Sequence, residues 1–170
     1  MPTSRNISVV LRTRYGRLTL VYDAESLKAI RFGGFGRNRS VQGIEVLNGA
    51  PPNRDARSLI KDLKRYFSGK PGGFSTEPHL GEYSDFQKAV WRATSAIPYG
   101  QTRSYGLIAS ELGRRKGTRA VGNALGMNPF PIVIPCHRVI GSDGALTGFG
   151  GGIEWKRALL ALEKGQIELF

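Results

Sequence analysis

A glycine- and proline-rich segment near the middle of the chain separates two different sequence patterns. Gly69-Lys70-Pro71-Gly72-Gly73, with Pro78 shortly after it, has the composition of a linker. The residues before it form mainly short β-prone runs, and the residues after it show mainly helical periodicity. The chain of 170 residues is therefore expected to have an α/β (α+β) fold with two domains, over residues 1–80 and 81–170.

The first half predicts an antiparallel sheet and one helix. The β-prone runs are residues 7–11, 18–22 and 27–32, with turns expected at Tyr15-Gly16 and at residues 23–25. Apolar residues at three- and four-residue spacing predict a helix from Asn53 to Ser68, followed by Gly69 at its C-terminal cap. Residues 33–40 are expected to form a mobile loop without a nucleotide-binding role. No catalytic residue types gather in this half, so we expect a structural domain.

The second half predicts a series of helices. Ser84-Asp85-Phe86-Gln87 has the pattern of a capping box and opens a helix that buries Phe86, Val90 and Trp91 and stops near Pro98. Ser104 is expected to cap a helix from Tyr105 to Leu112, and Thr118 a helix from Arg119 to about Met127. The tight basic turn that joins them, residues 113–117, is typical of a helix-turn-helix.

The charge of the chain favours a polyanionic partner. Its formal net charge is +12 and its pI is near 10.3, which indicates nucleic acid before membrane because no strongly basic amphipathic helix stands out. Residues 1–80 carry 14 Lys and Arg against 6 Asp and Glu, and residues 81–170 carry 11 against 7. The excess is therefore spread over both halves, and a basic surface that serves solubility alone is the alternative.

The second helix of the predicted helix-turn-helix has few side chains that could contact base edges. After Arg119 it consists almost entirely of small or apolar residues, from Ala120 to Gly126. Small residues allow close backbone approach, which suits sequence-independent binding in the minor groove of double-stranded DNA. The alternative is a helix packed tightly against another helix.

Other bulk features favour a cytoplasmic or nucleoid-associated protein. No apolar run approaches the roughly 18 residues that span a bilayer, and Met1 to Asn6 has no apolar core of a signal peptide. The single cysteine fits a reducing compartment. We therefore expect no membrane association.

That single cysteine, Cys136, stands next to His137, one of two histidines. One cysteine cannot form an intrachain disulfide, and one Cys with two distant His residues does not make a structural zinc site. A reactive thiol and a small buried hydrophobic residue both remain open. The apolar run of residues 131–135 is expected to be extended and buried, so that Cys136 and His137 need a bridging water or a turn to cooperate. Glu163 is the best candidate to orient the imidazole, and an exposed glutamate in a last helical turn is the alternative.

The segment Pro135-Cys136-His137-Arg138-Val139 resembles the active-site signature of the O6-alkylguanine-DNA alkyltransferases, the suicidal DNA repair methyltransferases. The resemblance covers nearly the whole second half. Its further motifs follow in the order of that family: Ile97-Pro98-Tyr99-Gly100, Ser104-Tyr105, Arg119-Ala120-Val121-Gly122, Asn128-Pro129, Leu146 to Gly151, and Lys156 to Glu163.

This resemblance implies direct DNA repair, in which Cys136 accepts the alkyl group of O6-alkylguanine, and also of O4-alkylthymine, in a single turnover. His137 would act through a water, Glu163 would hold the imidazole, Tyr105 would donate to the purine, and Asn128 would brace the Cys136 turn. No cofactor and no metal are expected, and the first half has no cysteine for the zinc site of some relatives. The implied fold is a ribonuclease H-like sheet domain followed by a winged-helix-like domain.

The resemblance also implies how a monomer would bind DNA from the minor groove. Arg119 would enter the duplex in place of the flipped alkylated base. The other implied DNA-binding residues are Tyr105, Gly122, Arg114 and Ser142. The implied pocket residues are Val139, Gly150, Phe149 and Leu125. The carbonyls of Val139 and Cys136 would accept from the guanine amine, and the amide of Gly150 would donate to O6. The alternative to the repair function is a non-enzymatic helix-turn-helix protein that recognises damaged bases. A cysteine hydrolase is a further rival, and it would need a base paired directly with the thiol.

Overall fold

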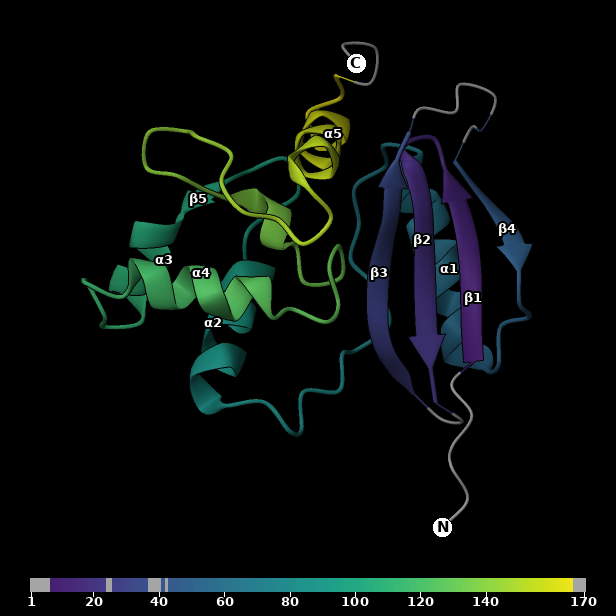
Figure 1. Cartoon of the computed structure of the whole chain (residues 1–170), viewed down its shortest axis with the longest axis horizontal. Helices are drawn as coiled ribbons and strands as arrows, with labels where there is room; N and C mark the ends of the chain where they lie inside the picture. The colour runs from purple at the N-terminus through teal and green to yellow at the C-terminus, as the bar shows by residue number, and fades with distance from the viewer. Residues whose placement is uncertain (1–6, 24–25, 37–40, 42, 167–170) are drawn as a thin grey trace. The chain divides into compact units, whose positions relative to one another are not determined.

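The computed structural model describes residues 7–23, 26–36, 41 and 43–166 (Figure 1). The chain divides into two compact units, Met1–His79 and Leu80–Phe170, and each unit is described by itself. The mixed α/β architecture predicted from the sequence is present, with an antiparallel sheet in the first unit and mainly helices in the second.

The first unit is a four-stranded antiparallel sheet with one helix on one of its faces (Figure 1). Its strands are β1 (Ile7–Thr13), β2 (Gly16–Tyr22), β3 (Leu27–Phe35) and β4 (Ile44–Asn48), in the order β3-β2-β1-β4. Alternate strand residues such as Val9, Leu11, Leu18 and Leu20 are fully buried beneath the helix. The predicted antiparallel meander is confirmed, and β4 adds an edge strand that the sequence patterns did not indicate.

The helix of this unit, α1 (Arg54–Phe67), is where the 3–4 spacing predicted it. The Asn53 side chain accepts a hydrogen bond from the Ala56 amide at 2.8 Å and caps the N-terminus. Gly69 follows the C-terminal cap with a φ of 73°, which a residue without a Cβ adopts without strain.

The predicted loop over residues 33–40 is wrong in its first part. Residues 33–35 continue β3, because Phe35 pairs with Gly16 of β2 and extends the hairpin. Gly33 suits this strand position since a Cβ there would lie only 3.0 Å from the Arg17 Cβ. Residues 37–40, and residues 24 and 25 of one predicted turn, lie outside the described residues.

The second unit consists of helices around a short parallel strand pair. Its elements are α2 (Asp85–Ser95), β5 (Arg103–Ser104), α3 (Tyr105–Glu111), α4 (Thr118–Gly126), the 3-10 turn η1 (Cys136–Arg138), β6 (Val139–Ile140) and α5 (Ile153–Glu163). Trp91 and Trp155 are fully buried, and the Trp91 indole donates to the Ala124 carbonyl at 2.9 Å, which ties α2 to α4. The α2 capping box and the Ser104 cap of α3 form as predicted.

Three details of the second unit differ from the sequence expectations. Thr118 is the first residue of α4 rather than its cap, and the cap residue Gly117 has no side chain to bond the helix. Phe86 is half-buried, with the Arg114 guanidinium 4.7 Å above its ring. The run of residues 131–135 is buried but not extended, because it turns at Ile132, where φ is 76°. None of the helices in the described residues has the length and apolar character needed to cross a membrane.

Candidate active site

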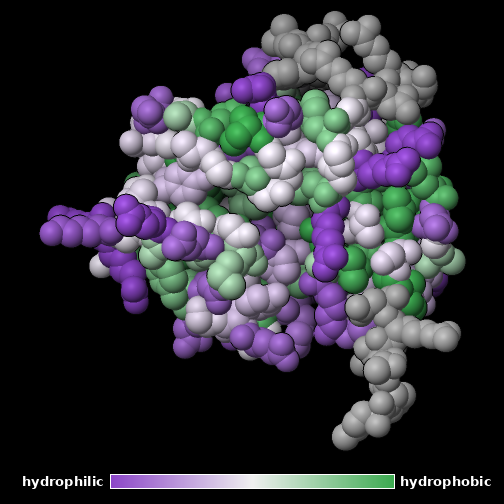
Figure 2. Space-filling model, in the orientation of Figure 1, coloured by the Kyte–Doolittle hydropathy of each residue, from purple (hydrophilic) through white to green (hydrophobic). Residues whose placement is uncertain are grey.

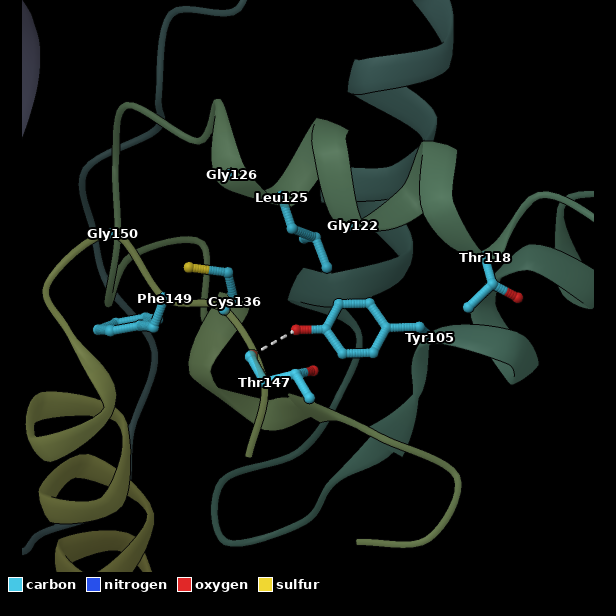
Figure 3. Close-up of a pocket in the computed structure, with 10 residues that line it drawn as sticks. Tyr105, Thr118, Gly122, Leu125, Gly126, Cys136, Thr147, Phe149 and Gly150 are labelled. Atoms are coloured by element: carbon cyan, nitrogen blue, oxygen red, sulfur yellow. Dashed lines mark hydrogen bonds between the residues drawn. The ribbon is translucent and has the colours of Figure 1, made fainter. Parts of the chain in front are cut away.

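Cys136 lies at a cavity of about 420 Å³ within the second unit (Figure 3). The cavity is half-open, and its lining comes from four segments: the start of α3, one face of α4, Cys136 at the start of η1, and the loop before α5. The lining residues are Tyr105, Thr118, Gly122, Leu125, Gly126, Cys136, Thr147, Gly148, Phe149 and Gly150. In Figure 3 the Cys136 sulfur lies between the end of α4 that carries Leu125 and Gly126 and the loop that carries Phe149 and Gly150.

The backbone before Cys136 is held in an unusual conformation. Ile132 is a buried β-branched residue with positive φ, which costs conformational energy that neighbouring contacts must offset. The Ile134 amide donates to the Phe130 carbonyl at 2.8 Å and closes this turn. Asn128, just after α4, donates from Nδ2 to the Ile134 carbonyl and accepts from the Phe130 amide, both at 2.9 Å. Asn128 therefore connects α4 to the turn that presents Cys136.

His137 is fully buried and is held by Glu163. The distance from its Nε2 to Glu163 Oε1 is 2.7 Å, and neither side chain is exposed to solvent. The same carboxylate accepts from Arg138 Nε at 2.9 Å, from Arg138 Nη2 at 3.0 Å and from the Gly100 amide at 2.9 Å. The alternative of an exposed last-turn glutamate is therefore wrong for Glu163.

The electrostatics of this cluster keep the thiol and the imidazole neutral at rest. Burial raises the pKa of the Cys136 thiol, although Asn128 and the Lys156 charge lower it in part. Burial also lowers the pKa of His137 and outweighs the opposing effect of Glu163. Burial alone would raise the pKa of Glu163, but His137 and Arg138 together hold it at about 2. Glu163 is thus the ionised member of the group, next to a neutral His137.

A second polar chain reaches the cavity through Lys156. This lysine is fully buried, and its Nζ donates to the Thr147 carbonyl at 2.8 Å and to the Tyr105 hydroxyl at 3.3 Å. The Tyr105 hydroxyl donates to the same Thr147 carbonyl at 3.0 Å (Figure 3). Burial lowers the pKa of Lys156 to about 8, against the attraction of the Cys136 charge. Lys156 can therefore supply a proton to Tyr105 near neutral pH.

The structure brings together some of the sequence-predicted site residues and leaves others apart. Cys136, Tyr105, Gly122, Leu125, Phe149 and Gly150 all line the cavity. Val139 is fully buried in β6 and is not among the lining residues. Arg114, Arg119 and Ser142 are exposed and also lie outside this lining. Arg119 instead borders a shallow depression at the start of α4, together with Lys116 and Asn123.

Sequence reasoning missed the roles of Arg138, Lys156 and the Gly100 amide. Arg138 also donates from Nη1 to the Ile97 carbonyl at 2.6 Å. All three groups stand inside the motifs of the family resemblance. Their contacts with Glu163, for Arg138 and Gly100, and with Tyr105, for Lys156, join residues 25 to 63 positions apart along the chain. Within the described part of the chain, no cluster of three or more His, Cys, Asp or Glu side chains could hold a metal ion.

Comparison with known proteins identifies relatives across the chain. The family model described as 6-O-methylguanine DNA methyltransferase, DNA binding domain, matches residues 85–165. A methylated-DNA–protein-cysteine methyltransferase of Mycobacterium bovis is 53% identical over 107 residues, which are 63% of this chain and 64% of that protein. The alignment thus spans slightly less than two thirds of that relative.

Other relatives align over nearly their full length. The methylated-DNA–protein-cysteine methyltransferase of Methanosarcina acetivorans is 39% identical over 155 residues, covering 91% of this chain and 96% of the relative. The crystal structure of Mycobacterium tuberculosis OGT in complex with DNA superposes with a TM-score of 0.76 at 41% identity, covering 92% of each chain. With Cys136 at the cavity and the adjacent His137 held by Glu163, this similarity shows that the chain belongs to the methylated-DNA–protein-cysteine methyltransferase family.

Proposed function

We propose that the chain repairs DNA directly, by moving the alkyl group of O6-alkylguanine in duplex DNA onto the Cys136 sulfur, once per molecule. The observation that carries this proposal is a buried thiol at a half-open cavity, beside an imidazole fixed by a carboxylate. The cavity volume of about 420 Å³ falls within the range of small-ligand sites. A helix-turn-helix protein that only recognises damage would have no use for this thiol.

Thiol activation requires a base, because the resting Cys136 is protonated. Glu163 accepts from His137 Nε2, so the neutral imidazole has its acceptor lone pair on Nδ1. We infer that Nδ1 removes the Cys136 proton through a bridging water. The Asn128 amide and the Lys156 charge both favour the resulting thiolate. Glu163 then stabilises the imidazolium, as a carboxylate does for a histidine base.

The transfer itself is an in-line displacement. The thiolate sulfur forms a bond to the alkyl carbon, the bond between that carbon and O6 breaks, and its electron pair stays on the guanine. Tyr105 donates a proton to the purine, and Lys156, whose Nζ lies 3.3 Å from the Tyr105 oxygen, replaces that proton. The thioether cannot revert to a thiol at this site, so each molecule acts once and needs no cofactor.

Recognition of the base is proposed to use backbone groups around the cavity. The carbonyls of Cys136 and Val139 would accept from the guanine amine, and the Gly150 amide would donate to O6. The Val139 side chain is buried away from the lining, so its carbonyl is the group invoked. Phe149 and Leu125 provide apolar walls. A cavity of this kind would also admit O4-alkylthymine.

DNA would be bound from the minor groove, with the alkylated base flipped into the cavity. Arg119, exposed at the start of α4, would occupy the space that the base leaves. Gly122 has no side chain, and the position of a Cβ there lies in open space with no atom within 4 Å, so DNA could come close to the α4 backbone. Arg114 and Ser142 would contact phosphates, and hydrophilic side chains project from the end of the unit where α3 and α4 meet (Figure 2).

We propose that residues 1–80 form a ribonuclease H-like structural domain and residues 81–170 a winged-helix-like domain that binds DNA and accepts the alkyl group. We also propose that the protein acts as a monomer in the cytoplasm or at the nucleoid.

Mass spectrometry of the intact protein tests the proposed function. After incubation with a duplex that contains one O6-methylguanine, we expect one added methyl group on the peptide of Cys136. The variant Cys136→Ser keeps a polar side chain of similar size and should gain no mass. Repeated turnover, or a label on any other residue, would refute the proposal.

A further inference from the structure

The outer face of α1 in the first unit carries a row of positive charges that the proposed chemistry does not use. Arg54, Arg57, Lys61 and Lys64 recur at spacings of three, four and three residues, and all are exposed. This spacing aligns them on one face of a helix. The opposite face of α1 buries Ala56, Leu59 and Leu63 against the sheet. We call the four cations the α1 basic stripe.

The acidic side chains of α1 do not neutralise this stripe. Asp62 is buried and accepts from Arg65 at 2.9 Å and from the Ser75 amide and hydroxyl at 2.8 and 2.7 Å. Asp55 is exposed, but it is a single carboxylate against four cations, and its charge, after burial, raises the pKa of Tyr22. Within the described residues, no ion pair involves any of the four cations.

The stripe weakens the helix that carries it. Like charges at i,i+3 and i,i+4 repel, and the pairs Arg54–Arg57, Arg57–Lys61 and Lys61–Lys64 all have these spacings. Burial of the opposite face holds α1 in place without any help from the cations. A partner that brings negative charge would remove the repulsion.

We propose that the α1 basic stripe binds backbone phosphates of duplex DNA, as a second contact in addition to that of the helix-turn-helix unit. The inference rests on the proposed function in one respect, namely that duplex DNA is the partner. Ten residues of helix separate Arg54 from Lys64, a distance of about 15 Å. DNA presents a dense array of phosphates over such a length.

The chemistry of the stripe favours DNA over a protein or a membrane. The exposed face of α1 has only Arg, Lys, Asp and Ser residues, and its apolar side chains are buried in the core. Protein interfaces rely on aromatic and other large anchors at their centre. Helices that lie on membranes need an apolar face free to enter the lipid. Phosphate contacts need only cations.

The salt dependence of DNA binding tests this proposal with a charge-matched control. The variant Arg57→Gln/Lys61→Gln removes two cations from the stripe and keeps good helix formers. Arg17→Gln/Arg31→Gln removes two exposed cations from β2 and β3, on the sheet face opposite α1. The dissociation constant for an unmodified duplex is measured for both variants and the wild type over a series of KCl concentrations.

We plot the logarithm of the DNA association constant against the logarithm of the KCl concentration. The slope should become shallower by about 1.8 in the stripe variant, because each of the two lost phosphate contacts contributes about 0.9. The control variant should keep nearly the wild-type slope. If the slope changes equally in both variants, only the net charge of the protein matters. If the slope is unchanged in both variants, the stripe does not contact phosphates. Either result overturns the proposal. A third result would also overturn the proposal: the stripe variant keeps the wild-type slope but binds DNA more weakly only when many protein molecules crowd one duplex. That result would indicate that the stripe contacts a second copy of the protein.

A second assay separates this proposal from the proposed function. Alkyl transfer from the free base O6-benzylguanine to Cys136 involves no phosphate, so both variants should react at the wild-type rate. If the wild type itself fails to react, the proposed function is in question, while the salt slopes still decide the role of the stripe.

Discussion

At the scale of single residues, Lys156 shows most directly how a proposed role in proton supply conflicts with stability. Burial lowers its pKa to about 8 from 10.5. The pKa of Lys156 is therefore lower in the folded protein than in the unfolded chain. Between pH 8 and 10.5 only the unfolded chain holds the proton, so the free energy of unfolding rises with pH over this range. At pH 7 both states are protonated, and burial of the charge costs on the order of 3 kcal/mol.

We therefore expect Lys156→Met to raise the free energy of unfolding at pH 7 while it slows alkyl transfer about 10- to 100-fold. The Thr147 carbonyl would still accept from Tyr105, so no buried acceptor loses all its partners. Urea denaturation and single-turnover transfer measure the two effects. Lys164→Met, at the exposed end of α5, serves as the control. A full transfer rate in Lys156→Met would exclude Lys156 from proton supply.

At the scale of elements, the connection between α4 and the Cys136 turn depends on Asn128. Asn128→Ala removes both hydrogen bonds to the turn and leaves the Ile134 carbonyl without this donor. We expect a loss of about 1–3 kcal/mol in stability. Transfer from the free base should slow as well, because Asn128 lowers the pKa of the Cys136 thiol.

Asn123→Ala provides the matched control for Asn128→Ala. Asn123 is exposed on α4, so its loss should change thermal stability and free-base transfer very little. If both variants behave alike, Asn128 does not hold the turn.

The elements themselves were predictable to different degrees. The capping box at Ser84, the Ser104 cap and the helical spacing are local signals, and α1, α2 and α3 appear where those signals predicted. The turn at Ile132 could not be predicted, because a β-branched residue with positive φ contradicts local preference and persists only through surrounding contacts. Strand β4 was missed for a similar reason, since its exposed residues follow no simple alternation and its pairing with β1 is a long-range contact.

At the scale of the whole molecule, the buried cluster should make the second unit sensitive to acid. The pKa of His137 is lowered from 6.5 by burial, and that of Glu163 is lowered from 4.5 to about 2 because His137 and Arg138 outweigh its burial. Both folded pKa values are below the unfolded ones. The free energy of unfolding that these two groups contribute is thus complete above pH 6.5. It declines below pH 6.5, where His137 gains a proton in the unfolded chain, and declines further from pH 4.5 to 2, where Glu163 gains a proton in the unfolded chain.

Tryptophan fluorescence can follow this effect in one unit alone, because both tryptophans of the chain, Trp91 and Trp155, belong to the second unit. We expect the midpoint temperature of the fluorescence transition to decrease over these pH ranges. Glu163→Gln should be less stable at pH 7 by about 3–5 kcal/mol, since Arg138 loses its buried counter-ion, and its profile should be flatter below pH 4.5. Parallel profiles for the variant and the wild type would contradict the assignment.

The sequence by itself determined the family of the chain and marked Cys136 as the candidate alkyl acceptor. Composition, capping signals and the ordered motifs around one cysteine indicated an α/β protein of this family, because these signals lie in short stretches of sequence. Only the tertiary structure decided that Glu163 is buried, that Arg138 and the Gly100 amide share its carboxylate, and that Lys156 meets Tyr105. These contacts join residues far apart in the chain, and the burial that shifts their pKa values exists only once the helices have packed.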